Sequence, residues 1–250
     1  MNGDGLKNMQ TIKGAVYHTE TFGAVDGPGI RYVFFLQGCS LKCLYCHNPD
    51  AIPRHGGESW TAEAAVEEVL KYKRYIKNGG VTFSGGEPLL QPAFVKAVSH
   101  ELKKEGIHIA IDTAGHVPLD QVREAVDEAD LILLDIKAMD NQTCKRLTGA
   151  GNEGAFKLLD YCEKMGKPVW IRHVLLTGYT LEDGQLQSLA ERLKGYQCIE
   201  KVELLPFHKL GEPKWENVPW KYELADTPAT TKQEHDHAKM IFERYEMKVQ

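Results

Sequence analysis

Three cysteines on one short stretch are the residues best suited to chemistry. Cys39, Cys43 and Cys46 lie in GCSLKCLYCHNPD, and their C-x3-C-x2-C spacing places three thiols on one loop. Thiolates are soft ligands that select iron–sulfur clusters and zinc. A [4Fe–4S] cluster held by three cysteines would leave one iron open to a substrate, which indicates reactivity. The alternative is a structural zinc site with His47 as the fourth ligand, although such sites usually join two cysteine pairs.

The other three cysteines stand singly, at Cys144, Cys162 and Cys198. Six cysteines in 250 residues are too few for the disulfide framework of a small secreted domain. Cys162 lies in the amphipathic stretch FKLLDYCEKMG, where a small buried side chain is expected. We therefore expect these three cysteines to be structural.

Composition and charge exclude several classes of protein. With 42% hydrophobic and 26% charged residues, the chain has an ordinary globular composition. Its formal net charge of −5 disfavours non-specific nucleic-acid binding. The apolar runs are far shorter than the roughly 20 residues that span a bilayer, so no membrane helix is expected. The first residues, MNGDGLKNMQ, do not form a signal peptide, and we expect a cytoplasmic protein.

Apolar runs and amphipathic stretches alternate along the chain, which is typical of βα units around a parallel sheet. Strands are predicted at 30–37, 80–84, 107–113, 131–136, 168–175 and 199–205. Helices are predicted at 61–77, 120–129, 155–165, 181–193 and 235–245. Six βα units indicate an α/β fold, an incomplete (β/α)6 barrel of the TIM type, in a single domain over 1–250. Residues 1–12 read as an N-terminal extension, and the proline-rich stretch 206–230 reads as an irregular loop that could bind a partner.

Polar residues mark five of the predicted strands, four of them at the strand's end and one, Arg172, within an apolar run; barrel and open α/β folds place their chemistry at strand ends. They are the SGGEP turn with Gly85, Gly86 and Glu87, then Asp112 and Thr113, Asp135 to Lys137, Arg172, and His208. The glycines could serve only the turn, and the charged residues could be solvated or locally ion-paired. Taken together with an open metal cluster, this set could hold a zwitterionic cofactor by its amine, carboxylate and hydroxyl groups.

The cysteine motif, with Tyr45 before the last cysteine, and the later GGEP motif resemble the radical S-adenosylmethionine (SAM) superfamily. VDGPGIR, residues 25–31, further resembles the glycyl-radical-enzyme activases of that superfamily. No further cysteine stands between Cys46 and Gly85, so the ferredoxin-like insertion of many activases is missing. With LLDIK, WIRHVLL and LLPFHKLG in order, the chain from about residue 13 onward is most similar to the activases of pyruvate formate-lyase.

The resemblance implies a [4Fe–4S] cluster on the three clustered cysteines, with SAM chelating the open iron. The residues implied to contact SAM are Tyr45, Cys46, His47, Gly85, Gly86, Glu87, Asp135, Ile136, Lys137, Arg172 and His208. A monovalent cation, sodium or potassium, would be held by Asp112, Thr113, Leu133 and Asp135. Asp26 would lie near the substrate peptide.

The implied reaction is reductive cleavage of SAM to a 5′-deoxyadenosyl radical, which abstracts a Cα hydrogen atom from a glycine of pyruvate formate-lyase. A flavodoxin or ferredoxin would donate the electron, and the chain would act as a monomer. Two alternatives stay within the superfamily: an enzyme acting on a small molecule, such as a deazaguanine-type synthase, and an activase of another glycyl radical enzyme. A zinc-binding adaptor without catalysis is an alternative from another class. The DGPGIR segment argues against the small-molecule enzyme.

Overall fold

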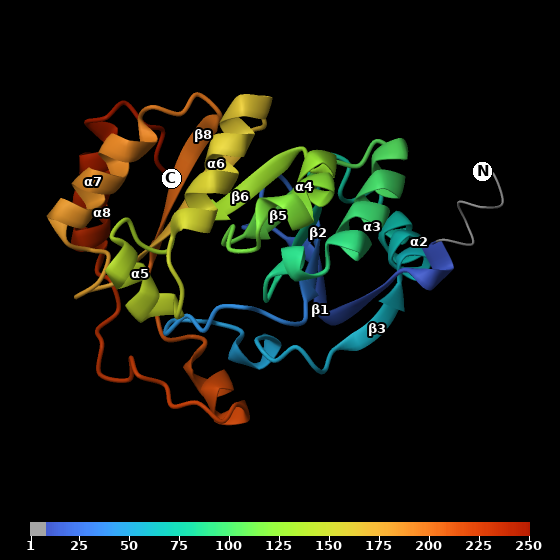
Figure 1. The fold of residues 1–250 in the computed structure, drawn as a ribbon, viewed down its shortest axis with the longest axis horizontal. Coiled ribbons are helices and arrows are strands. Elements are labelled where there is room, and N and C mark those ends of the chain that lie inside the picture. Colours follow the sequence, from blue (N-terminus) through green and yellow to red (C-terminus); the bar gives the residue numbers. More distant parts are fainter. Residues whose placement is uncertain (1–8) are drawn as a thin grey trace. The chain divides into compact units, whose positions relative to one another are not determined.

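The structure, a computed structural model, describes residues 9–250. In this part of the chain eight strands are hydrogen-bonded in the order β3-β1-β2-β4-β5-β6-β7-β8, with helices between them (Figure 1). The order has two ends, which agrees with the predicted incomplete barrel. The chain divides into two compact units. The first contains residues up to 40, 51–113 and 117–133, and the second contains 41–50, 114–116 and 134–250.

The first unit contains most of the strands. Its elements are β1 (Lys13–Gly23), β2 (Arg31–Leu36), β3 (Glu58–Thr61), α2 (Ala62–Lys71), β4 (Gly80–Gly85), α3 (Pro92–Lys104), β5 (Ile109–Thr113) and α4 (Leu119–Glu128). The next strand, β6 (Leu131–Asp135), begins in this unit and ends in the second. Strands β2, β4 and β5 pair in parallel, as expected for βα units. Their apolar side chains, among them Phe34, Phe83 and Ile111, are fully buried.

Two strands and two helices of the first unit differ from the sequence-based expectation. Strands β1 and β3 were not predicted; β1 pairs antiparallel with both β2 and β3. Helix α3 was not predicted either. Helix α2 is shorter than the expected 61–77: Thr61 caps it by accepting a hydrogen bond from the Ala64 amide, and it ends at Lys71. The chain then continues in turns that still bury Ile76. The expected N-terminal extension falls mostly on residues 1–8, outside the described residues.

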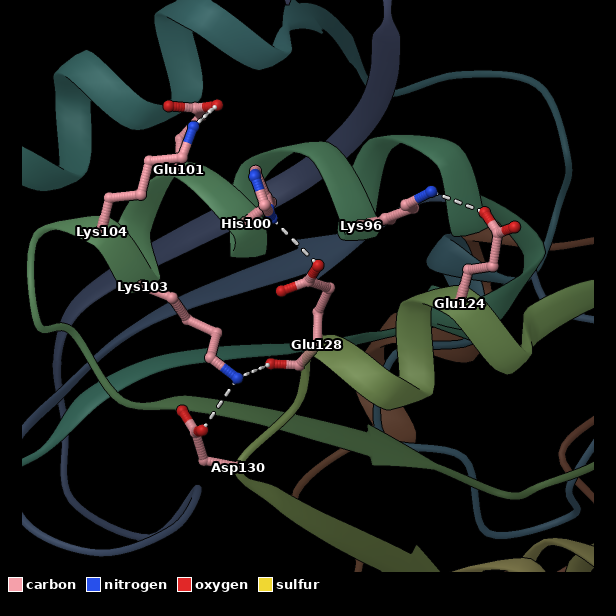
Figure 2. Close-up of polar contacts among 8 residues, drawn as sticks. All are labelled: Lys96, His100, Glu101, Lys103, Lys104, Glu124, Glu128 and Asp130. Carbon is pink, nitrogen blue, oxygen red and sulfur yellow. Dashed lines mark hydrogen bonds and ion pairs between the residues drawn. The ribbon is translucent and has the colours of Figure 1, made fainter.

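Helices α3 and α4 lie side by side and are joined by charged pairs on their exposed faces (Figure 2). Lys96 contacts Glu124 at 2.6 Å, and His100 contacts Glu128 at 3.0 Å. Lys103 reaches Asp130, just beyond the end of α4, at 3.1 Å. Exposed pairs of this kind contribute little individually, about 0–1 kcal/mol each. The apolar stripe beneath them, including Phe94, Val98 and Val126, holds the helices on the sheet.

The second unit contains the remaining elements. They are α5 (Asn141–Thr148), α6 (Glu153–Met165), β7 (Val169–Leu175), α7 (Asp183–Leu193), β8 (Ile199–Pro206) and α8 (Lys232–Glu243). Strands β7 and β8 are parallel, and α7 and α8 pack side by side (Figure 1). Helices α6, α7 and α8 and both strands were predicted, whereas α5 was not. Between β8 and α8 the described chain consists of turns and irregular backbone apart from the short 3-10 helix η3 (Glu212–Asn217).

The three single cysteines are buried, as expected for structural residues. Cys144, Cys162 and Cys198 are thiols with at most 9% of their surface exposed. Burial raises the pKa of Cys198 to about 12, so this thiol stays protonated at neutral pH. Among the helices of residues 9–250, we find none with the length and apolar character needed to cross a membrane.

Candidate active site

The SGGEP turn packs tightly against the start of the cysteine loop within the first unit. The Gly86 amide donates to the Leu36 carbonyl, and the Glu87 amide donates to the Gly38 carbonyl, both at 2.8 Å. A Cβ on Gly86 would lie 2.2 Å from the Gly38 oxygen, closer than real side chains come. Gly85 has φ +108°, which favours glycine. Both glycines are therefore needed for the end of β4 to approach the end of β2.

Glu87 is almost fully buried and has partners inside the protein. Its Oε1 accepts hydrogen bonds from the Leu89 amide at 3.1 Å and from the Thr113 hydroxyl at 2.7 Å. This carboxylate thereby caps the turn after β4 and ties it to the end of β5. The Ser84 hydroxyl makes a second link between these strands by donating to Asp112 Oδ2 at 2.7 Å. The polar groups that the sequence placed at two strand ends thus form one network in the first unit.

The DGPGIR segment is anchored by Arg31, a fully buried residue that sequence reasoning did not single out. Its guanidinium donates to Thr82 Oγ1 at 2.5 Å, to the Pro28 carbonyl at 3.0 Å and to the Val81 carbonyl at 2.5 Å. Thr82 donates in turn to the Asp26 carbonyl at 2.6 Å. Burial lowers the pKa of Arg31 to about 10, against the attraction of Asp26, so Arg31 remains cationic at neutral pH. Asp26, expected near the substrate peptide, is 8% exposed.

The cysteine loop begins in the first unit, where the Cys39 amide donates to the Ile52 carbonyl at 3.0 Å. In the second unit the loop docks on the end of α5. The Lys42 amide donates to the Thr148 carbonyl and the Leu44 amide to the Leu147 carbonyl, both at 2.9 Å. The last carbonyls of a helix have no partner within it, so the loop satisfies groups that α5 leaves available. Helix α5, which the sequence did not reveal, therefore supports the segment between Cys39 and Cys46.

Tyr45, Asp135 and Lys137 lie together in the second unit. Lys137 Nζ contacts Asp135 Oδ2 at 2.8 Å and lies 5.7 Å from the centre of the Tyr45 ring. Burial lowers the pKa of Lys137, but attraction to Asp135, Tyr45 and Cys43 outweighs it, so the pKa is raised well above its usual value. Lys137 is thus a permanent cation. The buried Tyr45 hydroxyl has no hydrogen-bond partner among the described residues, which fits a bound polar group beside it.

The backbone of Ile136, between Asp135 and Lys137, is held by β7. Its amide donates to the Arg172 carbonyl at 3.0 Å, and its carbonyl lies 2.6 Å from His173 Nδ1. A carbonyl only accepts, so Nδ1 of His173 carries the proton. Burial lowers the pKa of His173, which keeps the ring neutral. His173 positions the Ile136 carbonyl, a role that sequence reasoning missed. The available signal was a histidine next to Arg172 in the apolar run WIRHVLL.

His47 and His208 stack in the second unit, with ring centroids 4.5 Å apart. His47 Nε2 also lies 3.3 Å from the His208 carbonyl. Burial lowers the pKa of His47, so the pair is not a pair of cations at neutral pH. Arg172 pairs with its cross-strand neighbour Glu203, with Nε 3.5 Å from the carboxylate. His47, Arg172 and His208, with the Lys137 cluster, are predicted site residues that lie in the second unit.

Comparison with known proteins identifies the family. Residues 33–190 match the Radical SAM superfamily. The chain is 44% identical to a pyruvate formate-lyase-activating enzyme of Clostridium pasteurianum, over 89% of this chain and 94% of that protein. It belongs to the pyruvate formate-lyase-activating enzyme family of the radical SAM superfamily. A homologue of the same name from Staphylococcus aureus (strain USA300) is 43% identical over 87% of this chain and 90% of its own length.

A solved structure supports the radical SAM fold. A domain of a pyruvate-formate lyase-activating enzyme from Bacteroides vulgatus ATCC 8482 is 26% identical, with a TM-score of 0.58 over 69% of this chain and 98% of that chain. As a radical SAM enzyme, the chain uses a [4Fe–4S] cluster and SAM. This family membership excludes the zinc-binding adaptor and its structural zinc site. The donor set fits in kind, because three free thiols stand on one loop; burial, which raises the pKa of Cys46, favours its protonated form while no metal is bound. Thiols bind iron as thiolates, so cluster binding replaces that proton.

Proposed function

We propose that this chain activates pyruvate formate-lyase by converting one glycine of that enzyme into a glycyl radical. The observation that carries the proposal is the 44% identity, across almost the full length of both chains, to a pyruvate formate-lyase-activating enzyme. When bound, the reduced cluster supplies the electron that cleaves SAM into methionine and a 5′-deoxyadenosyl radical, which takes a hydrogen atom from the glycine Cα. The protein's own part is to bind, orient and exclude water.

The cluster ligands are Cys39, Cys43 and Cys46 in this proposal. Lys137 binds the carboxylate of SAM, because its raised pKa keeps it cationic. Asp135 holds Lys137 in place and reaches the ribose. Support for these roles comes from the rigid backbone of Ile136 between them.

The remaining SAM contacts are the residues that the resemblance suggested, namely Tyr45, His47, Gly85, Gly86, Glu87, Ile136, Arg172 and His208. Gly86 meets the methionyl amine through its backbone, with Glu87 holding the turn in shape. A sodium or potassium ion is held by Asp112, Thr113, Leu133 and Asp135; the Ser84 hydroxyl orients the Asp112 carboxylate. Asp26 meets the substrate peptide from a loop that Arg31 keeps rigid.

The chain is a single catalytic domain in this proposal, acting as a cytoplasmic monomer with a flavodoxin or ferredoxin as electron donor. The family match at 33–190 spans residues of both compact units, and the chain passes between the units repeatedly. Separate domains joined by one linker would not have this connectivity.

The test follows the abstracted hydrogen atom. Pyruvate formate-lyase is produced with glycine deuterated at Cα and is mixed anaerobically with the reconstituted, reduced chain and SAM. We expect deuterium in the 5′-deoxyadenosine product together with a gain of pyruvate formate-lyase activity. Unlabelled pyruvate formate-lyase is the matched control. Release of 5′-deoxyadenosine without deuterium from the labelled partner would contradict the assigned substrate.

A further inference from the structure

The end of the cysteine loop is contacted by the irregular stretch that follows β8, and both lie in the second unit. The Trp215 indole N–H donates to the Cys46 carbonyl at 3.1 Å. Lys214 Nζ donates to Asn48 Oδ1 at 2.7 Å. Trp215 is 7% exposed, so its hydrogen bond is shielded from water. Two consecutive residues of η3 thus hold two positions of the loop.

His47, which lies between Cys46 and Asn48, is contacted by Gly211. A Cβ on Gly211 would lie 2.6 Å from His47 Cα, too close for any other residue without a shift of the backbone. Gly211 is the residue that caps η3 at its N-terminus, and Lys214 and Trp215 follow it after one turn of three residues. These three residues therefore contact three consecutive residues of the loop, Cys46, His47 and Asn48.

Two aromatic contacts hold the stretch after β8, one within the stretch and one to the cysteine loop. The Trp215 ring packs on Tyr222 with centroids 5.4 Å apart. Lys42, at the other end of the loop, places its ammonium 4.6 Å from the centre of the Trp220 ring. Aromatic and cation–π contacts of this kind each add to the packing energy. The stretch is therefore anchored on both sides of Trp215.

We propose that residues 211–220, here called the strap, hold the Cys46 end of the cysteine loop in position, with Trp215 as the positioning residue for Cys46. The α5 helix already holds Lys42 and Leu44, so the strap fixes the end of the loop that α5 does not reach. This role rests on Cys46 being a cluster ligand, as in the proposed function. It differs from the expectation that residues 206–230 dock the partner protein.

The first test removes the indole donor with Trp215→Phe, which keeps an aromatic ring. Two rates are measured on the full chain: alkylation of Cys46 by iodoacetamide in the iron-free protein, mapped by mass spectrometry, and release of iron from the reconstituted protein to a ferrous chelator. Loss of one hydrogen bond predicts an increase of about fivefold in both rates. Trp170→Phe is the matched control, because it also removes an indole donor, here one bonded to Glu200 at 2.8 Å. Neither rate should change in this control.

The second test adds a methyl group with Gly211→Ala, which should push the strap away from His47 and raise both rates again. Gly184→Ala is its control, because a Cβ at Gly184 meets nothing within 4 Å. Both variants leaving Cys46 alkylation and iron release at control rates would overturn the strap, as would a Trp215→Phe variant that loses only partner binding. Neither rate involves pyruvate formate-lyase. Faster rates in the variants, together with an unaltered enzyme that cleaves SAM and fails to activate that partner, would therefore support the strap and refute the proposed substrate.

Discussion

Gly86→Ala is the substitution whose consequence can be worked out most fully. The new Cβ would lie 2.2 Å from the Gly38 carbonyl oxygen and 3.1 Å from that of Ala51. The turn must retreat by about 1 Å to relieve this overlap, and overpacking of this kind costs about 1–3 kcal/mol. Retreat also stretches the hydrogen bonds from the Gly86 and Glu87 amides, each contributing about 1 kcal/mol.

The total expected loss in the free energy of unfolding for Gly86→Ala is therefore about 2–4 kcal/mol. Because Gly86 is proposed to meet the amine of SAM, a shift of about 1 Å should also weaken SAM binding by about 10- to 100-fold. Urea unfolding gives the first quantity, and anaerobic equilibrium dialysis with SAM on the reconstituted protein gives the second. Gly184→Ala, where the added methyl group enters open space, should show neither loss. Unchanged SAM affinity in Gly86→Ala would refute the role given to this turn.

Two further predictions concern buried groups. Arg31→Leu should lower the free energy of unfolding by about 3–5 kcal/mol, because the Pro28 and Val81 carbonyls lose their donors and Asp26 loses its buried counter-charge; a loss below about 1 kcal/mol by urea unfolding would contradict the network. Folding lowers the pKa of His173 below its usual value of 6.5. Just below pH 6.5 the unfolded chain therefore binds a proton at this residue that the folded chain does not bind. Stability should then fall with decreasing pH, by at most about 1.4 kcal/mol per pH unit for this group, until the folded pKa is reached. His173→Gln, which keeps an N–H donor, should flatten that slope between pH 6.5 and 5.5 in urea titrations, and an unchanged slope would show that His173 does not titrate in this way.

The sequence predicted the parallel strands well because buried strands are continuous apolar runs bounded by turn residues, as in Leu131 to Leu134. It did not reveal β1, a strand that buries only Gly14, Val16 and Gly23 and exposes Lys13, His18, Glu20 and Phe22. Nor did it reveal α5, since NQTCKRLT is short and polar and is fixed by its Asp140 cap, its Gly149 end and its contact with the cysteine loop. Such elements depend on tertiary contacts that local patterns do not carry.

The sequence predicted which residues belong to the site, but not which hydrogen bonds those residues make. The order of polar residues after the strands located Glu87, Asp112 and Lys137. Their hydrogen-bond partners, such as Thr113 for Glu87, depend on strand register and could not be read from one chain. His173 was overlooked because a histidine in an apolar run is usually a core residue, and only its bond to the Ile136 carbonyl reveals a positioning role.

An anaerobic electron paramagnetic resonance spectrum tests most directly whether the chain activates pyruvate formate-lyase. The reconstituted, reduced chain is mixed with SAM and pyruvate formate-lyase, and the spectrum is recorded after the activase has been separated from its partner. We expect a stable glycyl radical doublet on pyruvate formate-lyase. A mixture that releases 5′-deoxyadenosine while the partner stays silent would contradict the assigned substrate.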